Sequence, residues 1–168
     1  MPPMTHPITR LLALSLALCA LPVAAAAPPA APPAAAPHAA GVIRLRSAND
    51  FDQTVARLKS DVAAKNIRFF DQIDQTALGA SADLKIRRST LVLFGNPPLG
   101  VQFLQSNPYA GLDWPVRMLV IEEADGSIWV AWTDFNFIAG RYAIGDRAAQ
   151  FKMASDVAQS IATAATSG

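Results

Sequence analysis

The sequence predicts an α+β domain over residues 41–168, with a mixed sheet of about five strands and several helices. Short apolar runs of strand length alternate with two longer segments whose apolar residues recur at helical spacing. The pair Asp125-Gly126 separates two apolar runs and predicts an antiparallel hairpin of strands 116–123 and 127–133. A single globular domain of this length can bury one hydrophobic core without disulfides.

The first half of the domain is predicted to contain three strands and one long helix. The strands are residues 42–46, 67–73 and 90–94, and a helix over 51–65 joins the first two. The apolar stripe of this helix consists of Phe51, Val55, Leu58 and Val62. Residues 75–88 show no clear period, so helix and loop both stay open there.

The second half is predicted to contain the hairpin, two short helices and a long C-terminal helix. The short helices are residues 99–106 and 135–142. The stripe of the last helix consists of Phe151, Ala154, Ala158, Ile161 and Ala165. Both hairpin strands are apolar on both faces, and such strands need cover on both sides. The long helices would cover one face, and the short helices or a second subunit the other. This favours a homodimer, with a helix-covered monomer as the alternative.

Three helix starts are predicted from residues that cap helices. Ser47 followed by Asp50 resembles a capping box before the first helix. Asn96 precedes Pro97, a residue that suits the first helical position. Asp146 is expected to cap the last helix.

The N-terminus is typical of a secretory signal peptide over residues 1–26. Arg10 precedes an apolar run at 11–21, and alanines that suit cleavage follow. Residues 27–40 contain five prolines and no apolar residue larger than alanine or proline, which predicts a disordered Ala/Pro-rich linker. We therefore expect a periplasmic domain with no membrane insertion after cleavage. The alternative is a domain that an uncleaved N-terminus anchors to the membrane.

The charge and residue types of the domain exclude several classes of function. Residues 41–168 carry thirteen acidic and thirteen basic residues, so a nucleic-acid partner is not expected. The only cysteine is Cys19 and the only histidines are His6 and His38, all outside the domain. Thiol nucleophiles, histidine-dependent triads and Cys/His metal sites are therefore excluded within it. We predict no catalytic residue, no metal site and no cofactor.

A group of short motifs resembles a known family. The motifs are Phe94-Gly95-Asn96-Pro97, Asn107-Pro108 and Gly111-Leu112-Asp113-Trp114-Pro115. Over about residues 42–144 the chain resembles the bacterial domain-of-unknown-function family 302, which implies a small α/β domain that forms dimers and is exported in some members. Ile73-Asp74 matches the family's Ile-Asp-His segment, but Gln75 replaces the histidine. The resemblance therefore favours a binding role here over proton transfer.

The leading hypothesis is an exported, non-catalytic module that binds a small molecule or a partner protein. Its candidate ligand-binding residues lie at predicted strand ends, where they are expected to converge: Asp74, Gln75, Asn96, Asp113 and Trp114. One alternative is a hydrolase or isomerase that uses two carboxylates, drawn from strand-end residues such as Asp71 and Asp134. Another is a purely structural dimeric envelope protein.

Overall fold

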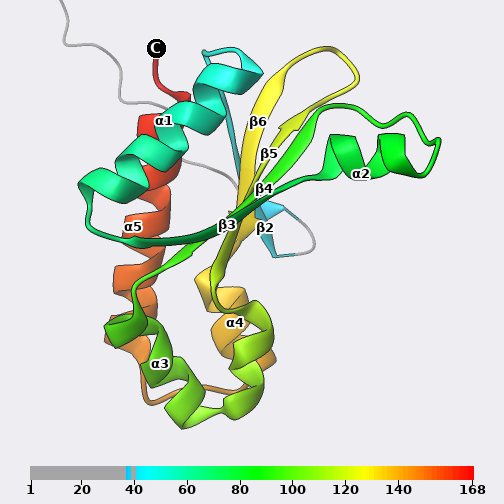
Figure 1. Cartoon of the computed structure of the whole chain (residues 1–168). Coiled ribbons are helices and arrows are strands. Elements are labelled where there is room, and N and C mark those ends of the chain that lie inside the picture. Colours follow the sequence, from blue (N-terminus) through cyan, green and yellow to red (C-terminus); the bar gives the residue numbers. More distant parts are fainter. Residues whose placement is uncertain (1–36, 39–40) are drawn as a thin grey trace, which may run out of the picture. The chain divides into compact units, whose positions relative to one another are not determined.

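Antiparallel strands form the centre of the domain, and helices cover one face of their sheet (Figure 1). The computed structural model describes residues 37–38 and 41–168. The sheet has the order β1-β2-β6-β5-β4-β3. Its strands are β1 (Pro37–His38), β2 (Val42–Arg46), β3 (Arg68–Asp74), β4 (Ser89–Gly95), β5 (Val116–Glu122) and β6 (Ile128–Thr133). The α+β class is confirmed, although the pairings are all antiparallel and not mixed.

Five α-helices and one 3-10 helix connect or follow the strands. They are α1 (Phe51–Ala64), α2 (Gln75–Ser81), α3 (Pro97–Ser106), η1 (Pro108–Asp113), α4 (Phe135–Arg141) and α5 (Ala148–Thr166). The undecided segment 75–88 thus forms helix α2 and a following loop. Among the described residues no helix is both long and apolar enough to cross a membrane.

The N-terminal predictions fall mostly outside the described residues. The signal peptide and all of the linker except residues 37–38 cannot be compared with the structure. Pro37 and His38 form strand β1, which pairs with Ile43 and Val42 of β2. Two residues of the segment predicted to be disordered are therefore in a strand.

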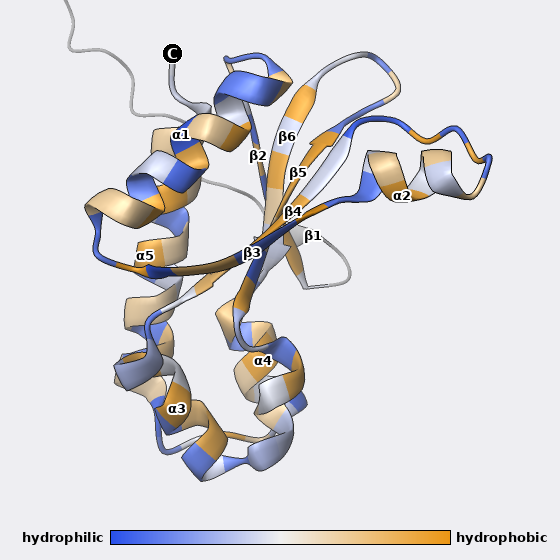
Figure 2. Cartoon of the chain, viewed as in Figure 1, coloured by the Kyte–Doolittle hydropathy of each residue, from blue (hydrophilic) through white to orange (hydrophobic). Residues whose placement is uncertain are grey.

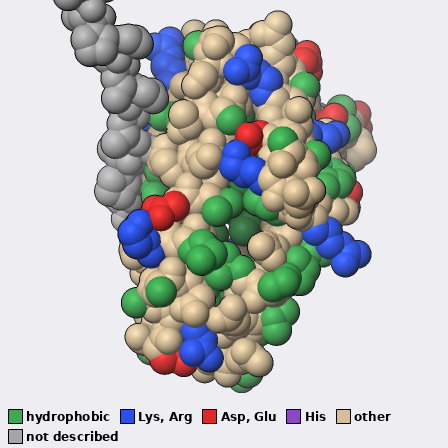
Figure 3. Space-filling model, turned by 90° about the vertical axis from the view of Figure 1, so that its left-hand side faces the viewer, with side chains coloured by type: hydrophobic (Ala, Val, Ile, Leu, Met, Phe, Trp, Pro, Cys, Tyr) green, Lys and Arg blue, Asp and Glu red, His purple; other side chains and the backbone are tan. Residues whose placement is uncertain are grey.

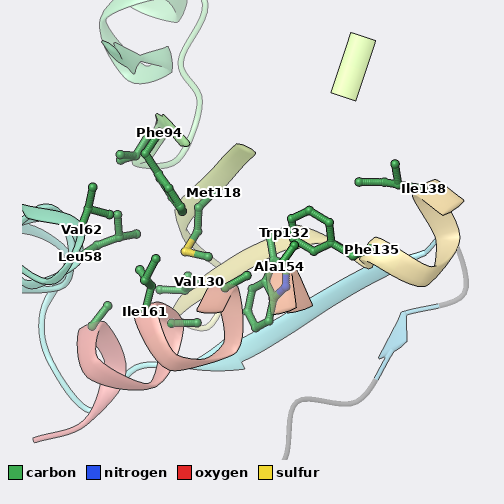
Figure 4. Close-up of a cluster of buried hydrophobic side chains, with 14 of the residues drawn as sticks. Leu58, Val62, Phe94, Met118, Val130, Trp132, Phe135, Ile138, Ala154 and Ile161 are labelled. Carbon is green, nitrogen blue, oxygen red and sulfur yellow. The ribbon is translucent and has the colours of Figure 1, made fainter. Parts of the chain in front are cut away.

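The core lies between the sheet and the two long helices. Helix α1 buries Phe51, Leu58 and Val62, and α5 buries its whole predicted stripe. These side chains meet alternate residues of the central strands, such as Met118 and Val130, which have no exposed area (Figure 4). Burying an apolar side chain of this size contributes roughly 1.5–3 kcal/mol. The periodicity seen in the sequence therefore identified the correct helix faces.

Two of the three predicted capping residues are wrong. Asp50, not Ser47, is the N-cap of α1, and its side chain accepts a hydrogen bond from the backbone N–H of Gln53 at 2.8 Å. Ser47 is hydrogen-bonded to Thr54 instead. Helix α5 begins after Arg147, while Asp146 accepts a hydrogen bond from Ser106 at 3.0 Å. In both cases the helix begins later than the predicted capping residue suggests, and the side chain of that residue is hydrogen-bonded elsewhere.

No helix within residues 41–168 forms a layer over the second face of the sheet. Helices α3 and α4 gather at one end of the sheet, and α2 projects away from it (Figure 1). The strand registers place one row of half-buried apolar side chains on this face: Ile73, Leu91, Leu93, Leu119, Ile121, Trp129 and Ala131. We call the face of the sheet that carries these side chains the open face. The short helices therefore do not supply the cover that the sequence required.

Strand β3 forms the edge of the sheet beyond β4. Its register shifts between Phe69 and Asp71, which marks a β-bulge. Phe69 and Phe70 beside the bulge are 43% and 36% exposed. The bulge therefore interrupts a strand whose outer edge pairs with no other strand among the described residues.

Helix α3 packs closely on the indole of Trp114, which gives a test of the fold. A Cβ atom at Gly100 would overlap this indole, whereas one at Gly140 would meet nothing within 4 Å. We expect Gly100→Ala to lower the free energy of unfolding by about 1–3 kcal/mol, the usual cost of overpacking. Urea denaturation would measure it. Gly140→Ala, the control within α4, should be neutral or slightly stabilising; equal behaviour of the two variants would contradict the packing described.

Candidate functional site

An apolar pocket lies where α3, α5 and the ends of β4 and β5 meet. Figure 3 shows a hollow walled by hydrophobic side chains on the helical side of the molecule. The pocket has a volume of about 40 Å³, enough for a few water molecules. Its lining includes Phe94, Leu99, Phe103, Trp114, Val157 and Asn96. It can hold a small apolar group, but not a whole metabolite.

Trp114 and Asn96 are the two predicted site residues in this pocket. The Trp114 backbone is extended, with φ −127° and ψ 135°, and its ring meets Phe70 edge to face at 5.6 Å. Asn96 stands at the predicted N-cap of α3, but its side chain makes no capping hydrogen bond. Pro97 and Pro98 follow it, so this helix start lacks two of its backbone donors. The corner is thus a poor anion site.

A larger polar groove lies between α1 and strand β3. Its volume is about 570 Å³, within the range of pockets that bind small molecules. The lining combines apolar and charged residues: Phe51, Asp52, Val55, Ala56, Lys59, Gln72, Asp74, Thr76, Arg88 and Thr90. We call it the α1–β3 groove. Hydropathy along the chain agrees with this mixture, since both hydrophilic and hydrophobic residues occur on α1 and β3 (Figure 2).

Two hydrogen-bonded pairs organise the charges of the α1–β3 groove. Lys59 donates to Oε1 of Gln72 at 3.0 Å, which ties α1 to β3. Arg88 donates to Asp52 at 2.5 Å, and its guanidinium lies 4.2 Å from the centre of the Phe51 ring. The hydrogen bond to the Asp52 carboxylate raises the pKa of Arg88 above its ordinary value. Like any arginine, Arg88 is a cation at every physiological pH.

Asp74 and Gln75 lie at the end of β3 where α2 begins. Asp74 lines the groove, and its carboxylate caps α2 by accepting from the N–H of Ala77 at 3.0 Å. Gln75 accepts from the hydroxyl of Ser89 at 2.7 Å. Both side chains thus have structural partners. At the position of the family histidine, the amide joins α2 to the first residue of β4.

Asp113 is the most deeply buried of the predicted site residues. Its side chain is 5% exposed, and it accepts hydrogen bonds from Arg117, Arg141 and Tyr142. Arg141 lies at 3.1 Å and the Tyr142 hydroxyl at 2.6 Å, both from Oδ2. Donation to this carboxylate raises the pKa of Tyr142 above its ordinary value. A buried carboxylate with two guanidinium partners is fully compensated in charge.

The five predicted residues do not converge. Asp74 and Gln75 lie at the start of β4, while Asn96 follows its end, and six residue steps of about 3.4 Å separate these ends by roughly 20 Å. Only Asn96 and Trp114 line a common pocket. Asp113 points into a different network. The antiparallel pairing of β3 with β4, which the sequence did not reveal, explains this separation.

Several residues of these sites could not be assigned to a common site from the sequence. Lys59 lies on helix α1 and belongs to no sequence motif. Arg141 and Tyr142 reach Asp113 from 28 and 29 residues away in the chain. Arg117 follows Asp113 by four residues, which is a weak local signal outside a helix. Only the fold brings these side chains together.

The carboxylates that a hydrolase would need are engaged elsewhere. Asp71 accepts from the N–H of Gln72 at 2.7 Å, and Asp134 caps α4. Within residues 37–38 and 41–168 no group of three or more acidic, histidine or cysteine side chains is arranged to hold a metal ion.

Part of this chain is similar in sequence to curated proteins. The chain is 28% identical over 119 residues to the fluoride-specific ion channel FluC 1 of Brucella suis biovar 1, a match of 71% of this chain and 44% of the relative. It has the same identity to FluC 2 of Brucella melitensis biotype 1, of which the match covers 42%. The chain thus spans less than half the length of these curated relatives.

A solved structure shares the fold. The uncharacterized conserved protein DUF302 from Bacillus stearothermophilus superposes with a TM-score of 0.68 at 13% identity, over 74% of this chain and 98% of that one. At this identity the likeness shows the fold alone. Residues 43–167 also match the family described as a domain of unknown function, DUF302. Because that match covers most of the chain, the protein belongs to the DUF302 family.

Proposed function

We propose that this DUF302 domain is an exported, non-catalytic module of the cell envelope that binds a polar small molecule in the α1–β3 groove. The signal-like residues 1–26 and the Ala/Pro-rich segment 27–40 support export to the periplasm. An uncleaved N-terminus would instead hold the domain at the membrane. Mass spectrometry of the exported protein separates these two cases.

The size and lining of the groove carry the proposal. A volume of about 570 Å³ suits a metabolite-sized ligand, and the apolar pocket of about 40 Å³ does not. Phe51 and Val55 offer an apolar wall, while Lys59, Arg88 and Asp74 offer charges of both signs. This combination favours a ligand that carries an anionic and a cationic or hydroxyl group.

Binding explains the groove better than catalysis does. Asp52 and Asp74 are its two carboxylates, but Asp52 is paired with Arg88 and Asp74 caps α2. General acid–base work needs a carboxyl group free to exchange its proton with a substrate. The hydrolase or isomerase alternative would therefore have to break one of these interactions first.

A second role, as a homodimer, is supported by the open face and helix α2. Soluble domains rarely leave a large apolar patch uncovered. Helix α2 has no buried residue, and Leu78, Leu84 and Ile86 around it are 58%, 64% and 45% exposed. A helix of seven residues has little stability without packing. A second copy seated on the open face would cover the sheet and pack against this projecting helix.

The curated relatives suggest one kind of setting for such a module. Segments similar to this chain form 42–44% of proteins named fluoride-specific ion channels. The domain type therefore occurs within longer chains. We propose on this basis that the domain acts as an accessory to other envelope components and not as a self-sufficient enzyme.

Filling the groove should abolish ligand binding. Ala56→Trp adds an indole to an exposed position that lines the groove, whereas Ala63→Trp adds one to an exposed position of α1 outside it. Native mass spectrometry of protein recovered from the periplasm without refolding should show a discrete extra mass on the wild type and on Ala63→Trp. We expect at least a tenfold loss of that species for Ala56→Trp.

Two outcomes would contradict the binding role. One is a wild-type protein without any retained mass that also gives no saturable chemical-shift changes at groove residues with a panel of amino acids and sugars. The other is equal retention by both tryptophan variants, which would place the ligand elsewhere.

Placing a charge on the open face should separate the dimer. Leu119→Lys puts an ammonium in the centre of the open face, and burying an unpaired charge there is costly. We expect its dimer dissociation constant to rise at least tenfold, about 1.4 kcal/mol. Sedimentation velocity over a concentration series measures it. Met153→Lys on α5, where Met153 is 56% exposed, is the matched control and should remain as dimeric as the wild type. A wild type that remains monomeric at 100 times the protein concentration of the binding experiments would contradict the dimer proposal.

A further inference from the structure

We infer that Arg117 and Arg141 form a binding site for a small oxyanion, such as a phosphate or carboxylate group of a free ligand. This site contains no residue of the α1–β3 groove. Arg117 lies on the open face, on the same side of β5 as Leu119, so the site is the one that a single copy presents. It is built around Asp113, which acts as a positioning residue.

The buried carboxylate binds both guanidiniums, one at each of its oxygens. Arg117 binds Oδ1 of Asp113 and Arg141 binds Oδ2, so the same carboxylate fixes both. Arg117 comes from β5 and Arg141 from the last turn of α4. Tyr142 also donates to Oδ2 and further fixes the orientation of the carboxylate. Because these groups stand on regular elements, the pair is preorganised before a ligand arrives.

The cluster carries more positive charge than Asp113 can neutralise. Two guanidiniums face one carboxylate, and the Tyr142 hydroxyl, whose pKa is raised, contributes no negative charge. Among the described residues, neither arginine forms an ion pair with any other acid. A net single positive charge therefore remains on this part of the surface.

Both arginines keep hydrogen-bond donors free for a ligand. Each guanidinium has five N–H groups in a planar fork that matches oxyanions. The side chains of Arg117 and Arg141 are 43% and 51% exposed, whereas the carboxylate between them is 5% exposed. Each guanidinium gives one hydrogen bond to Asp113, so further N–H groups are left for a ligand.

Structural need alone does not account for the second arginine. One guanidinium and the Tyr142 hydroxyl would already compensate the charge and hydrogen bonds of a buried carboxylate. The second arginine adds charge and donors beyond what the acid uses, which suits recognition of an anion.

Arginine side-chain NMR tests this site directly. The protein would be titrated with inorganic phosphate at constant ionic strength, with chloride as the balancing anion, while the Nε–H signals of arginine are followed. We expect the signals of Arg117 and Arg141 to shift saturably and that of Arg87, an exposed arginine on the loop before β4, to stay unchanged. Arg141→Gln should weaken phosphate binding at least fivefold, and Arg87→Gln should leave it unchanged.

Two results would overturn the inference. The first is a wild-type response that is the same for chloride and phosphate, or the same at Arg87 as at the pair. The second is a response of Arg117 and Arg141 to protein concentration but not to phosphate, which would assign them to a carboxylate of a second copy. If Arg141→Gln fails to fold, the wild-type titration and Arg141→Lys, which keeps the charge without the fork, decide the question. Neither result would bear on ligand retention in the α1–β3 groove.

Discussion

The packing of α1 and α5 against one face of the sheet is the interaction on which the remaining architecture depends. The side chains with no exposed area, including Leu58, Met118, Val120 and Ile161, lie in this layer. Because the two helices satisfy only one face, the apolar residues of the opposite face are left half-buried. The helical layer also has borders, and the α1–β3 groove and the apolar pocket lie at two of them. The positions of these two cavities thus follow from how far the helices extend.

Trp114 connects this layer to the far end of the domain. Its ring lies against Gly95 and Gly100, which have no side chain to displace it, and contacts Phe70 of the edge strand. Asp113, the preceding residue, is turned away into its arginine and tyrosine partners. Two adjacent residues of one short motif therefore serve an apolar pocket and a charged cluster. This division explains why residues that stand together in the sequence do not share one site.

Much of the fold follows from local pattern, and much of the candidate site does not. The stripes of α1 and α5 were predictable because helical spacing is a property of a few consecutive turns. The hairpin was predictable because Asp125-Gly126 supplies a backbone with positive φ, which is +78° at Gly126. In contrast, the separation of Asp74 from Asn96 depends on which strands are neighbours. The partners of Asp113 depend on where α4 lies after a further hairpin. Such pairings are properties of the whole fold. The periodicity of apolar residues along the chain carries no information about them.

The bulge in β3 affects how readily this chain aggregates through its sheet edge in concentrated solution. An open sheet edge can form backbone hydrogen bonds with another extended chain. Phe69 and Phe70 would strengthen such pairing by apolar contacts. The shift in register between Phe69 and Asp71 breaks the regular spacing of donors and acceptors beside these rings. Arg68 and Asp71 add charge next to the same apolar pair. Another strand therefore cannot pair with seven consecutive residues of β3, and this disfavours polymerisation through the edge. The aromatic side chains beside the bulge remain accessible to solvent.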